Sequence, residues 1–322
     1  MTLSPLEDTS TAPKTPGAPP KTWNDHAKNL AGAGALVLFT LILIEILLRA
    51  VDPWGLHYFQ DLETMGNSIF QSDFVRGYII PDGDYNFTRW HAQVQDSRRV
   101  VPETYSFSDC KIAILGDSVA FGYGVNDEQT WINVAAREFP GVQLISLGVP
   151  RYNSTNVVGT WQDYPNADAY LYLIISNDLE PALNLESERF AGSGTGQPWI
   201  VRYTNFALKR GGGTDQIELQ VQTDDAAAPP LPDQYPGLAR FWNEIEELRT
   251  DERVYFAAFE KEPLTSTLLA RDLPLTTWTY PFKRRISLAD YHLNPTGNEE
   301  LAAQAVPLLR QIVQDRCPNT ES

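Results

Sequence analysis

Residues 111–125 read KIAILGDSVAFGYGV. The apolar run at 111–115 stops at Gly116-Asp117-Ser118, a pattern typical of a buried strand that enters a turn. Other short apolar runs predict four further strands, at 142–147, 169–176, 253–259 and 273–279. Helices are expected at about 128–139, 153–163 and 298–314, the last with a kink or break at Pro307. Strands that alternate with helices predict an α/β fold, with a parallel sheet covered on both faces.

The composition restricts the function. The chain has 322 residues, of which 43% are hydrophobic, so it can bury a core and is not disordered throughout. It has 41 Asp and Glu against 25 Lys and Arg, a formal net charge of −16. Nucleic-acid binding requires a basic surface, so we expect no nucleic-acid partner.

One segment is much more apolar than the rest of the chain. Residues 30–48 read LAGAGALVLFTLILIEILL, with Glu45 as the single charge, which is long enough to cross a bilayer. We interpret residues 30–51 as a transmembrane anchor. A cleaved signal peptide is the alternative, but a long polar tail precedes the segment and no small-residue cleavage site follows it. Glu45 and Arg49 are four residues apart and can pair on one helix face.

The charges near the ends of this segment suggest its orientation. Three lysines precede it, Lys14, Lys21 and Lys28, whereas only Arg49 follows closely. By the positive-inside rule, we expect a single-pass protein of the cell membrane with a cytoplasmic N-terminus. The chain from about residue 52 onward would then be extracytoplasmic.

The remaining chain divides by composition. Residues 1–29 are rich in Pro, Thr and Lys and should be disordered. Residues 52–105 are interpreted as a stalk or lead-in segment, and residues 106–322 as the α/β domain. Residues 183–237 are rich in Gly, Pro, Asp and Thr, which indicates an insertion of loops, with or without a short hairpin.

The two cysteines, Cys110 and Cys317, are predicted to form a disulfide. Cys110 begins the first strand and Cys317 follows the last helix. Covering helices run antiparallel to the strands, so both positions should lie at the same end of the sheet. A bridge would fit an oxidising compartment. Two unrelated free thiols are the alternative.

Ser118 stands at the carboxyl end of the first strand, where open α/β sheets bind ligands. The sequence around it lacks the spacing of a phosphate loop, a dinucleotide fingerprint or the G-x-S-x-G elbow. Gly148, Asn177 and the pair Asp290 and His292 follow later elements at the same edge. Acyl transfer needs a nucleophile, a base, an orienting carboxylate and oxyanion donors. These residues include all four types.

In these residues the chain resembles the SGNH (GDSL-type) hydrolase family, over about residues 111–303. Its matching segments are Gly116-Asp117-Ser118 with FGYGV, Gly148 in LGVPRYN, Asn177 in SNDL, and Asp290-Tyr291-His292 with LNPTGN. The anchor before the domain looks like membrane-tethered bacterial members.

The resemblance implies a flavodoxin-like three-layer α/β/α fold without a metal or organic cofactor. It also implies that Ser118 is the nucleophile, His292 the base and Asp290 its partner. The oxyanion donors would be the backbone N–H groups of Ser118 and Gly148 and the side-chain amide of Asn177.

Two positions depart from the family pattern. The commonest acid lies three residues before the histidine, where this chain has Ala289, so Asp290 takes the role from two residues before. Arg151 stands where relatives often have glycine. Together with Arg284 in the Lys283-Arg284-Arg285 run, it could bind an anionic group of the substrate. A solvated basic turn is the alternative.

The sequence therefore predicts a serine esterase that acts on acyl esters, most simply acetyl esters, of a carbohydrate or a cell-envelope polymer. An O-acyltransferase with the same site is one alternative. A non-catalytic carbohydrate-binding or assembly module is the other. No two His or Cys residues have metal-ligand spacing, so no metal is expected. The sequence gives no information about protein partners.

Overall fold

The computed structural model describes residues 23–104, 107–183, 185, 198–211 and 228–318. The chain forms two compact units, Met1–Ala50 and Val51–Ser322.

The described part of the first unit is helical. Helix α1 (Trp23–Val51) begins before the predicted start at residue 30. An 18-residue window within its segment His26–Val51 has a mean hydropathy of 2.4, so by length and composition the segment can cross a membrane. Arg49 Nε donates a hydrogen bond to Glu45 Oε1 over 2.8 Å, as the spacing of the two residues predicted. Residues 1–22 of the predicted disordered tail lie outside the described residues.

The second unit is built on one mixed, eight-stranded sheet. Its five parallel strands coincide with the predicted ones: β6 (Cys110–Leu115), β7 (Val142–Ser146), β8 (Ala169–Ile174), β9 (Val254–Phe259) and β10 (Leu275–Trp278). Three antiparallel strands extend the sheet: β3 (Gly83–Asn86), β4 (His91–Gln95) and β5 (Arg98–Arg99). The order across the sheet is β10-β9-β8-β6-β7-β5-β4-β3. The unit thus has the predicted α/β class.

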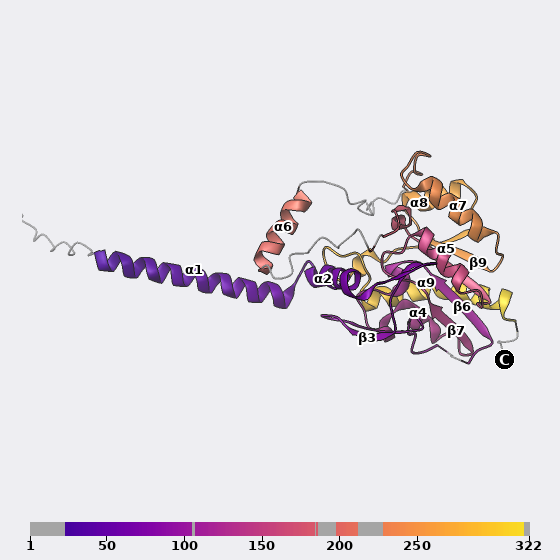
Figure 1. The fold of residues 1–322 in the computed structure, drawn as a ribbon, viewed down its shortest axis with the longest axis horizontal. Coiled ribbons are helices and arrows are strands. Elements are labelled where there is room, and N and C mark those ends of the chain that lie inside the picture. The colour runs from indigo at the N-terminus through magenta and orange to yellow at the C-terminus, as the bar shows by residue number, and fades with distance from the viewer. Residues whose placement is uncertain (1–22, 105–106, 184, 186–197, 212–227, 319–322) are drawn as a thin grey trace, which may run out of the picture. The chain divides into compact units, whose positions relative to one another are not determined.

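Helices cover both faces of the parallel strands (Figure 1). Side chains alternate along a strand, so Ile112 and Ile114 of β6 face one core while Ala113 and Leu115 face the other. The first core is closed by α4 (Trp131–Ala136) and α9 (Pro295–Arg316). The second is closed by α5 (Ser154–Asp163), α7 (Leu238–Arg249) and α8 (Pro263–Ala270). Burial on both faces explains why these strands are apolar throughout.

Two predicted helices differ in detail from the observed ones. The helix expected at 128–139 is a 3₁₀ turn, η2 (Asp127–Gln129), followed by the short α4. Helix α9 begins earlier than expected and continues through Pro307, so the predicted break there is wrong. Proline removes one helical hydrogen bond. Leu301, Ala305 and Leu309 are buried in the core on either side of it and hold the helix against the sheet.

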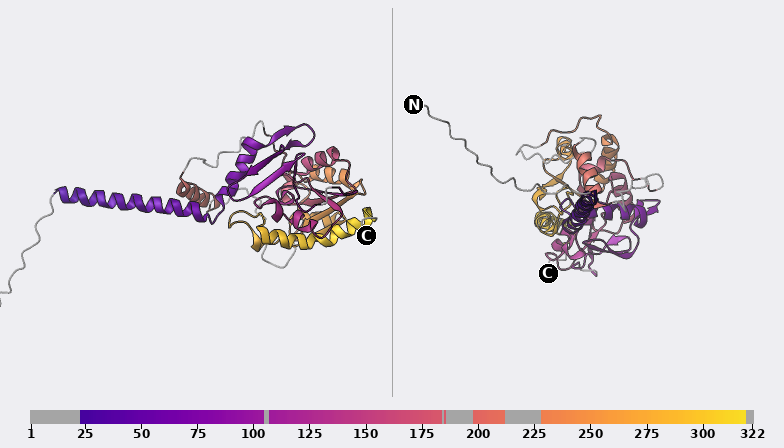
Figure 2. Two further views of the ribbon diagram at one scale, coloured as in Figure 1. Left: turned by 90° about the horizontal axis from the view of Figure 1, so that it is seen from below. Right: turned by 90° about the vertical axis from the view of Figure 1, so that its left-hand side faces the viewer.

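Residues 52–104 form a layer of the second unit, which we call the N-terminal extension. It contains α2 (Leu56–Thr64), a π-helical turn η1 (Met65–Ile69) and a separate hairpin of β1 (Gln71–Asp73) and β2 (Gly77–Ile79), before strands β3–β5 join the main sheet. Its aromatic core includes Tyr78 and Trp90 together with Phe121 and Tyr123, which follow Ser118. Figure 2 shows the extension and α9 on opposite sides of this unit. The segment predicted as a stalk or lead-in therefore packs directly on the residues that follow Ser118.

The predicted insertion, residues 183–237, contains one described helix, α6 (Trp199–Gly211). Tyr203 Oη of α6 donates to Asp52 Oδ1 over 2.5 Å, and Arg202 Nη1 donates to Gln60 Oε1 over 3.1 Å. The described residues of the insertion include no strand. Residues 184, 186–197 and 212–227, where a hairpin was considered, lie outside the described part of the chain.

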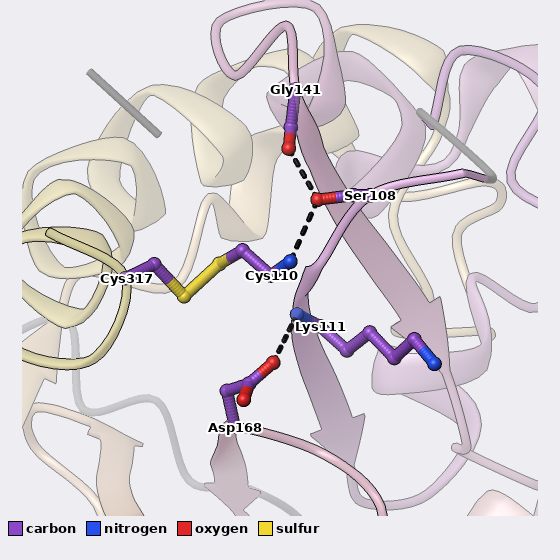
Figure 3. The surroundings of a disulfide bond; sticks show 6 residues. All are labelled: Ser108, Cys110, Lys111, Gly141, Asp168 and Cys317. Atoms are coloured by element: carbon purple, nitrogen blue, oxygen red, sulfur yellow. Dashed lines mark hydrogen bonds between the residues drawn. A yellow bond between two sulfur atoms is a disulfide. The ribbon is translucent and has the colours of Figure 1, made fainter. Parts of the chain in front are cut away.

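Cys110 and Cys317 form a disulfide, which confirms the predicted pairing (Figure 3). Cys110 begins β6 and Cys317 follows the last turn of α9, so the bridge joins the first strand of the parallel sheet to the last helix. Neighbouring polar contacts fix the same end of β6. Ser108 Oγ accepts from Cys110 N over 2.9 Å, and Asp168 Oδ2 accepts from Lys111 N over 2.8 Å.

Candidate active site

The site lies at the carboxyl edge of the parallel strands. Ser118 is the first residue of α3 (Ser118–Phe121), which follows β6 after a two-residue turn. Gly148 follows β7, and Asn177 lies in η3 (Ser176–Leu179) after β8. Asp290 and His292 lie in the loop that leads into α9. Because parallel strands end at one edge, residues far apart in sequence converge there.

Three side chains form a continuous hydrogen-bonded series. Asp290 Oδ1 lies 2.5 Å from His292 Nδ1, and His292 Nε2 lies 2.7 Å from Ser118 Oγ. Asp290 Oδ1 also accepts from the backbone N–H of His292 over 2.9 Å. That second contact closes a tight turn, in which a carboxylate two residues before the histidine can still face its Nδ1. The order is therefore carboxylate, imidazole, hydroxyl, as proton transfer from a serine requires.

The pKa of His292 is raised. Burial lowers it, but the negative charge and hydrogen bond of Asp290, with a smaller contribution from Asp117, more than offset the burial. Protonated His292 would donate its Nε2 proton to Ser118 Oγ, and the serine proton would point to Asp117 Oδ2, 2.9 Å away. Neutral His292, with its proton on Nδ1, accepts from Ser118 instead. Only this neutral form can take the serine proton.

Candidate oxyanion donors surround Ser118. Within the described chain, the backbone N–H groups of Ser118 and Gly148 have no hydrogen-bond partner. Gly148 lies against α3 so closely that a Cβ atom there would lie 2.6 Å from the backbone nitrogen of Phe121. A larger residue would therefore push the loop after β7 away from α3 and Ser118.

Asp117 organises the same region. Its Oδ1 accepts from the backbone N–H of Val119 over 2.9 Å and so caps α3. Its Oδ2 lies within hydrogen-bond distance of both Ser118 Oγ, at 2.9 Å, and Asn177 Nδ2, at 2.8 Å. One oxygen atom thus brings the amide of Asn177 close to the nucleophile. The second N–H of that amide is not used by any described residue.

A cavity of about 240 Å³ opens beside Ser118. An apolar cavity of about 150 Å³ can hold a benzene molecule, so this one has room for a group larger than acetyl. Its apolar wall comes from several elements, with Tyr58, Phe59 and Leu62 of α2 on one side and Phe259 and Tyr280 on another. The extension therefore builds part of the cavity.

The polar part of the cavity is acidic. Its lining includes four carboxyl groups, those of Asp117, Glu180, Glu262 and Asp290. Among the described lining residues there is no lysine or arginine. Glu262 is buried, and Ser176 Oγ donates to its Oε2 over 2.7 Å. Burial raises the pKa of Glu262 to about 7, although hydrogen bonds from Ser176 oppose that rise.

Ser287 links the loop of Asp290 and His292 to the extension. Its hydroxyl donates to the carbonyl of Trp54 over 2.9 Å and accepts from the backbone N–H of Asp290 over 3.0 Å. The N–H of Leu288 donates to the carbonyl of Pro53 over 3.1 Å. A Cβ at Gly55, whose φ is +69°, would lie 2.5 Å from Ser287 Oγ. Residues 53–55 therefore support the loop that holds Asp290.

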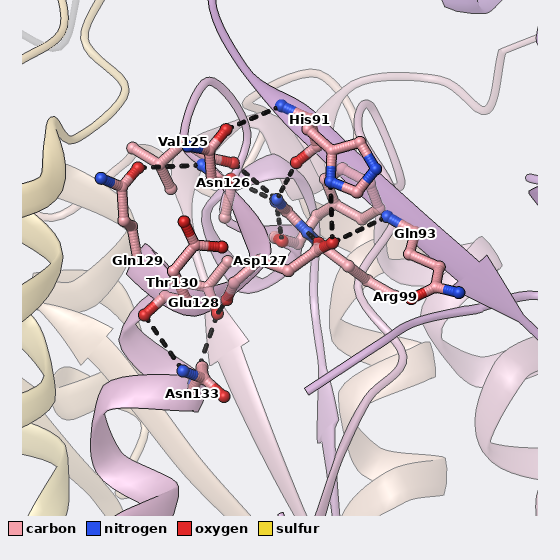
Figure 4. Close-up of polar contacts among 12 residues, drawn as sticks. His91, Gln93, Arg99, Val125, Asn126, Asp127, Glu128, Gln129, Thr130 and Asn133 are labelled. Carbon is pink, nitrogen blue, oxygen red and sulfur yellow. Dashed lines mark hydrogen bonds and ion pairs between the residues drawn. The ribbon is translucent and has the colours of Figure 1, made fainter. Parts of the chain in front are cut away.

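Arg99 binds the segment that follows Ser118, and Figure 4 shows its contacts with Asp127 and Val125. Its guanidinium is buried and donates to Asp127 Oδ1 over 2.7 Å. It also donates to the carbonyls of Phe121, Gly122 and Val125, which follow Ser118. Burial lowers the pKa of Arg99, and the charge of Asp127 opposes this. One side chain of β5 thus fixes the end of α3 and the turn after it.

Arg151 and Arg284 are not among the described residues that line the cavity. Arg151 is exposed and has a φ of +68°, a conformation that glycine adopts more easily, in line with the glycine expected in relatives. Arg284 pairs with Glu300 of α9 over 2.8 Å. The cavity geometry therefore gives no support to their predicted contact with an anionic substrate group. In the described residues, no cluster of three or more His, Cys, Asp or Glu could hold a metal ion.

No protein-family model and no curated protein matches the chain. It is similar to several solved structures. One is a lipolytic protein of the G-D-S-L family from Veillonella parvula, with 10% identity, 63% of this chain and 99% of that chain covered, and a TM-score of 0.33. A carbohydrate acetylesterase family member from Sinorhizobium meliloti has 15% identity, 64% and 99% coverage, and a TM-score of 0.32.

A third is a family two carbohydrate esterase from Cellvibrio japonicus, with 17% identity, 65% of this chain and 63% of that chain covered, and a TM-score of 0.33. These structures belong to esterases and a lipolytic protein. The TM-scores are below 0.5, so a function for this chain has to be argued from its own site.

The sequence interpretation missed four contributors to the site: Glu262, Ser287, Arg99 and the wall from α2. Glu262 lies three residues beyond β9, so the rule that ligands bind at the carboxyl edge could have found it. Arg99 and the wall residues of α2 have no comparable sequence signal, because the extension contacts the site only through tertiary packing.

Proposed function

We propose that this chain is a serine esterase of the SGNH (GDSL-type) class, anchored to the membrane by α1. The observation that carries the proposal is the hydrogen-bonded series from Asp290 through His292 to Ser118, in the wall of a cavity. Ser118 is one of the residues that line this cavity.

In the proposed reaction, Ser118 Oγ attacks the ester carbonyl while its proton moves to His292 Nε2. Asp290 stabilises the imidazolium that forms. The backbone N–H groups of Ser118 and Gly148 and the amide of Asn177 stabilise the oxyanion. The imidazolium then protonates the leaving alcohol, and an acyl-enzyme remains. Water, activated by neutral His292, attacks that ester and releases the acid and free Ser118.

Several features support the finer parts of the proposal. The five parallel strands lie in the chain order 2-1-3-4-5 across the sheet, which fits a flavodoxin-like arrangement. The disulfide fits an extracytoplasmic domain. The substrate we propose is an acyl ester of a carbohydrate or cell-envelope polymer. An acetyl group fits the cavity, and so does a larger acyl group.

Hydrolysis of 4-nitrophenyl acetate and butyrate by the full chain in detergent micelles tests the proposal. Wild type should hydrolyse at least one of them, and Ser118→Ala should lower kcat by roughly 10⁴–10⁶-fold. Ser72→Ala, on exposed β1, is the matched control and should leave kcat unchanged. Activity that survives Ser118→Ala would contradict the proposal. A wild type without hydrolysis would favour a non-catalytic module, and transfer of the acyl group to an added alcohol in preference to water would favour an acyltransferase.

A further inference from the structure

The cavity beside Ser118 combines two features that together recognise one kind of ligand. Five aromatic side chains line it in addition to His292, and Phe259 and Tyr280 pack edge to face with ring centroids 4.7 Å apart. Four carboxyl groups line the same space. Aromatic faces and carboxylates both attract cations, and an ammonium group binds best where it meets both.

Of the four carboxyl groups, Glu262 is the one available for such a role. Asp117 is already hydrogen-bonded to Ser118, Val119 and Asn177. Asp290 is committed to His292, and Glu180 is exposed at the edge of the cavity. Glu262 is 3% exposed, and its hydrogen-bond donor is Ser176.

No cation balances Glu262 within the described cavity lining. The titratable groups that interact with it electrostatically are Asp117, Asp178 and Tyr280. Burial raises the pKa values of Asp178 and Tyr280 well above their ordinary range, and neither side chain carries a positive charge in either protonation state. A bound cation would therefore supply the charge that the surroundings of Glu262 lack.

We propose that Glu262 and the aromatic wall form a subsite for a positively charged group, so that the enzyme prefers esters carrying an ammonium group. This inference rests on the proposed function and names the substrate class. The substrate charge that it predicts is positive, whereas the sequence predicted a negative charge from Arg151 and Arg284.

Two pairs of probe esters measure this preference in the full chain. In the first, acetylthiocholine is compared with 3,3-dimethylbutyl thioacetate, which replaces the charged nitrogen with carbon. In the second, the charge is on the acyl side, with the 4-nitrophenyl esters of 4-(trimethylammonio)butyrate and 5,5-dimethylhexanoate. In at least one pair, kcat/KM at pH 8 should be about tenfold higher for the cationic ester.

The ratio of kcat/KM for the cationic ester to kcat/KM for its neutral partner should depend on pH and on Glu262. It should rise with a midpoint near pH 7, as Glu262 loses its proton, and dividing the two rates cancels the titration of His292. Glu262→Gln should lower the ratio about tenfold and remove its pH dependence. Ser176→Ala should move the midpoint to higher pH, because it removes a hydrogen bond that lowers the pKa of Glu262. Glu246→Gln, at an exposed position of α7, removes a negative charge at a distance and should change neither the ratio nor its midpoint.

Binding of butyltrimethylammonium, measured by calorimetry at pH 8, tests Glu262 without turnover. Wild type should bind it about tenfold more tightly than Glu262→Gln. Equal affinities, or ester ratios that Glu262→Gln and Ser176→Ala leave unchanged, would overturn the subsite. Weak or absent hydrolysis of all four esters, with the expected difference in binding, would count against the proposed esterase and not against the subsite. If Glu262→Gln fails to fold, the midpoint in Ser176→Ala decides.

Discussion

The five parallel strands and the N-terminal extension contribute differently to the candidate site. The parallel half presents Ser118, Gly148 and Asn177 directly from strand ends and leads to the loop of Asp290 and His292. The extension holds none of these groups. It contributes Arg99, the carbonyls of Pro53 and Trp54, and the wall from α2. In the proposed reaction, the parallel half supplies the reacting groups, and the extension holds them in position.

The first prediction concerns the extension and has the largest expected effect on stability. Arg99→Met leaves Asp127 buried without its ion pair and removes the donors to three carbonyls after Ser118. It should lower the free energy of unfolding by about 3–5 kcal/mol, as measured by urea denaturation. Arg98→Met is the matched control, because Arg98 pairs with the exposed Asp96, and it should cost under about 1 kcal/mol. Equal losses in the two variants would show that Arg99 has no special role.

The second prediction concerns the parallel half. Asn177→Ala removes a proposed oxyanion donor and should lower kcat by about 10²–10³-fold. The free energy of unfolding should change much less than in Arg99→Met, since Asn177 is only half-buried. Steady-state kinetics and urea denaturation on the same samples separate the two effects. A variant that loses stability but keeps its kcat would reverse the roles assigned to the two halves.

The third prediction concerns the contact between the halves. Ser287→Ala breaks the link from Trp54 to the backbone of Asp290 and should lower kcat about tenfold, with KM nearly unchanged. A loosened Asp290 raises the pKa of His292 less, so the acid limb of the pH profile should move to lower pH. Ser72→Ala again serves as the control. A change in KM alone, with an unmoved pH profile, would rule out a positioning role.

The smallest effect is expected at the two predicted substrate-binding arginines. Arg151→Gly suits the positive φ at that position, and Arg284→Ala breaks an exposed pair with Glu300. Because neither lines the cavity, kcat/KM should change by less than about twofold for neutral and for anionic esters alike. A selective loss for anionic esters would restore the role predicted from the sequence.

The sequence predicted the fold and the candidate site where two signals were present. These were the apolar runs of the strands and the shared edge at which parallel strands end. Apolar runs identified every parallel strand, and the rule that parallel strands end at one edge brought Ser118, Asn177 and His292 together. The same topology placed Cys110 and Cys317 at the opposite edge, where the disulfide forms.

The extension could not be predicted in the same way. Its strands have two to five residues of mixed polar composition, so no apolar run distinguishes them from a loop. β5 is joined to the parallel strand β7 by a single residue pair, Arg99 and Ser146, which are far apart in sequence. Such contacts depend on tertiary packing, which a single sequence does not reveal. The fit of Asp290 two residues before His292 likewise became clear only from the turn geometry.

Covalent labelling of Ser118 with a fluorophosphonate tests the central claim most directly. In the full chain, we expect one adduct, located on Ser118 by peptide mass spectrometry and absent or far slower in His292→Ala. Its rate should rise with pH with a midpoint above the ordinary histidine value of about 6.5, because Asp290 raises the pKa of His292 and only neutral His292 can take the serine proton. Failure to label Ser118, or labelling that is equally fast in His292→Ala, would contradict the account.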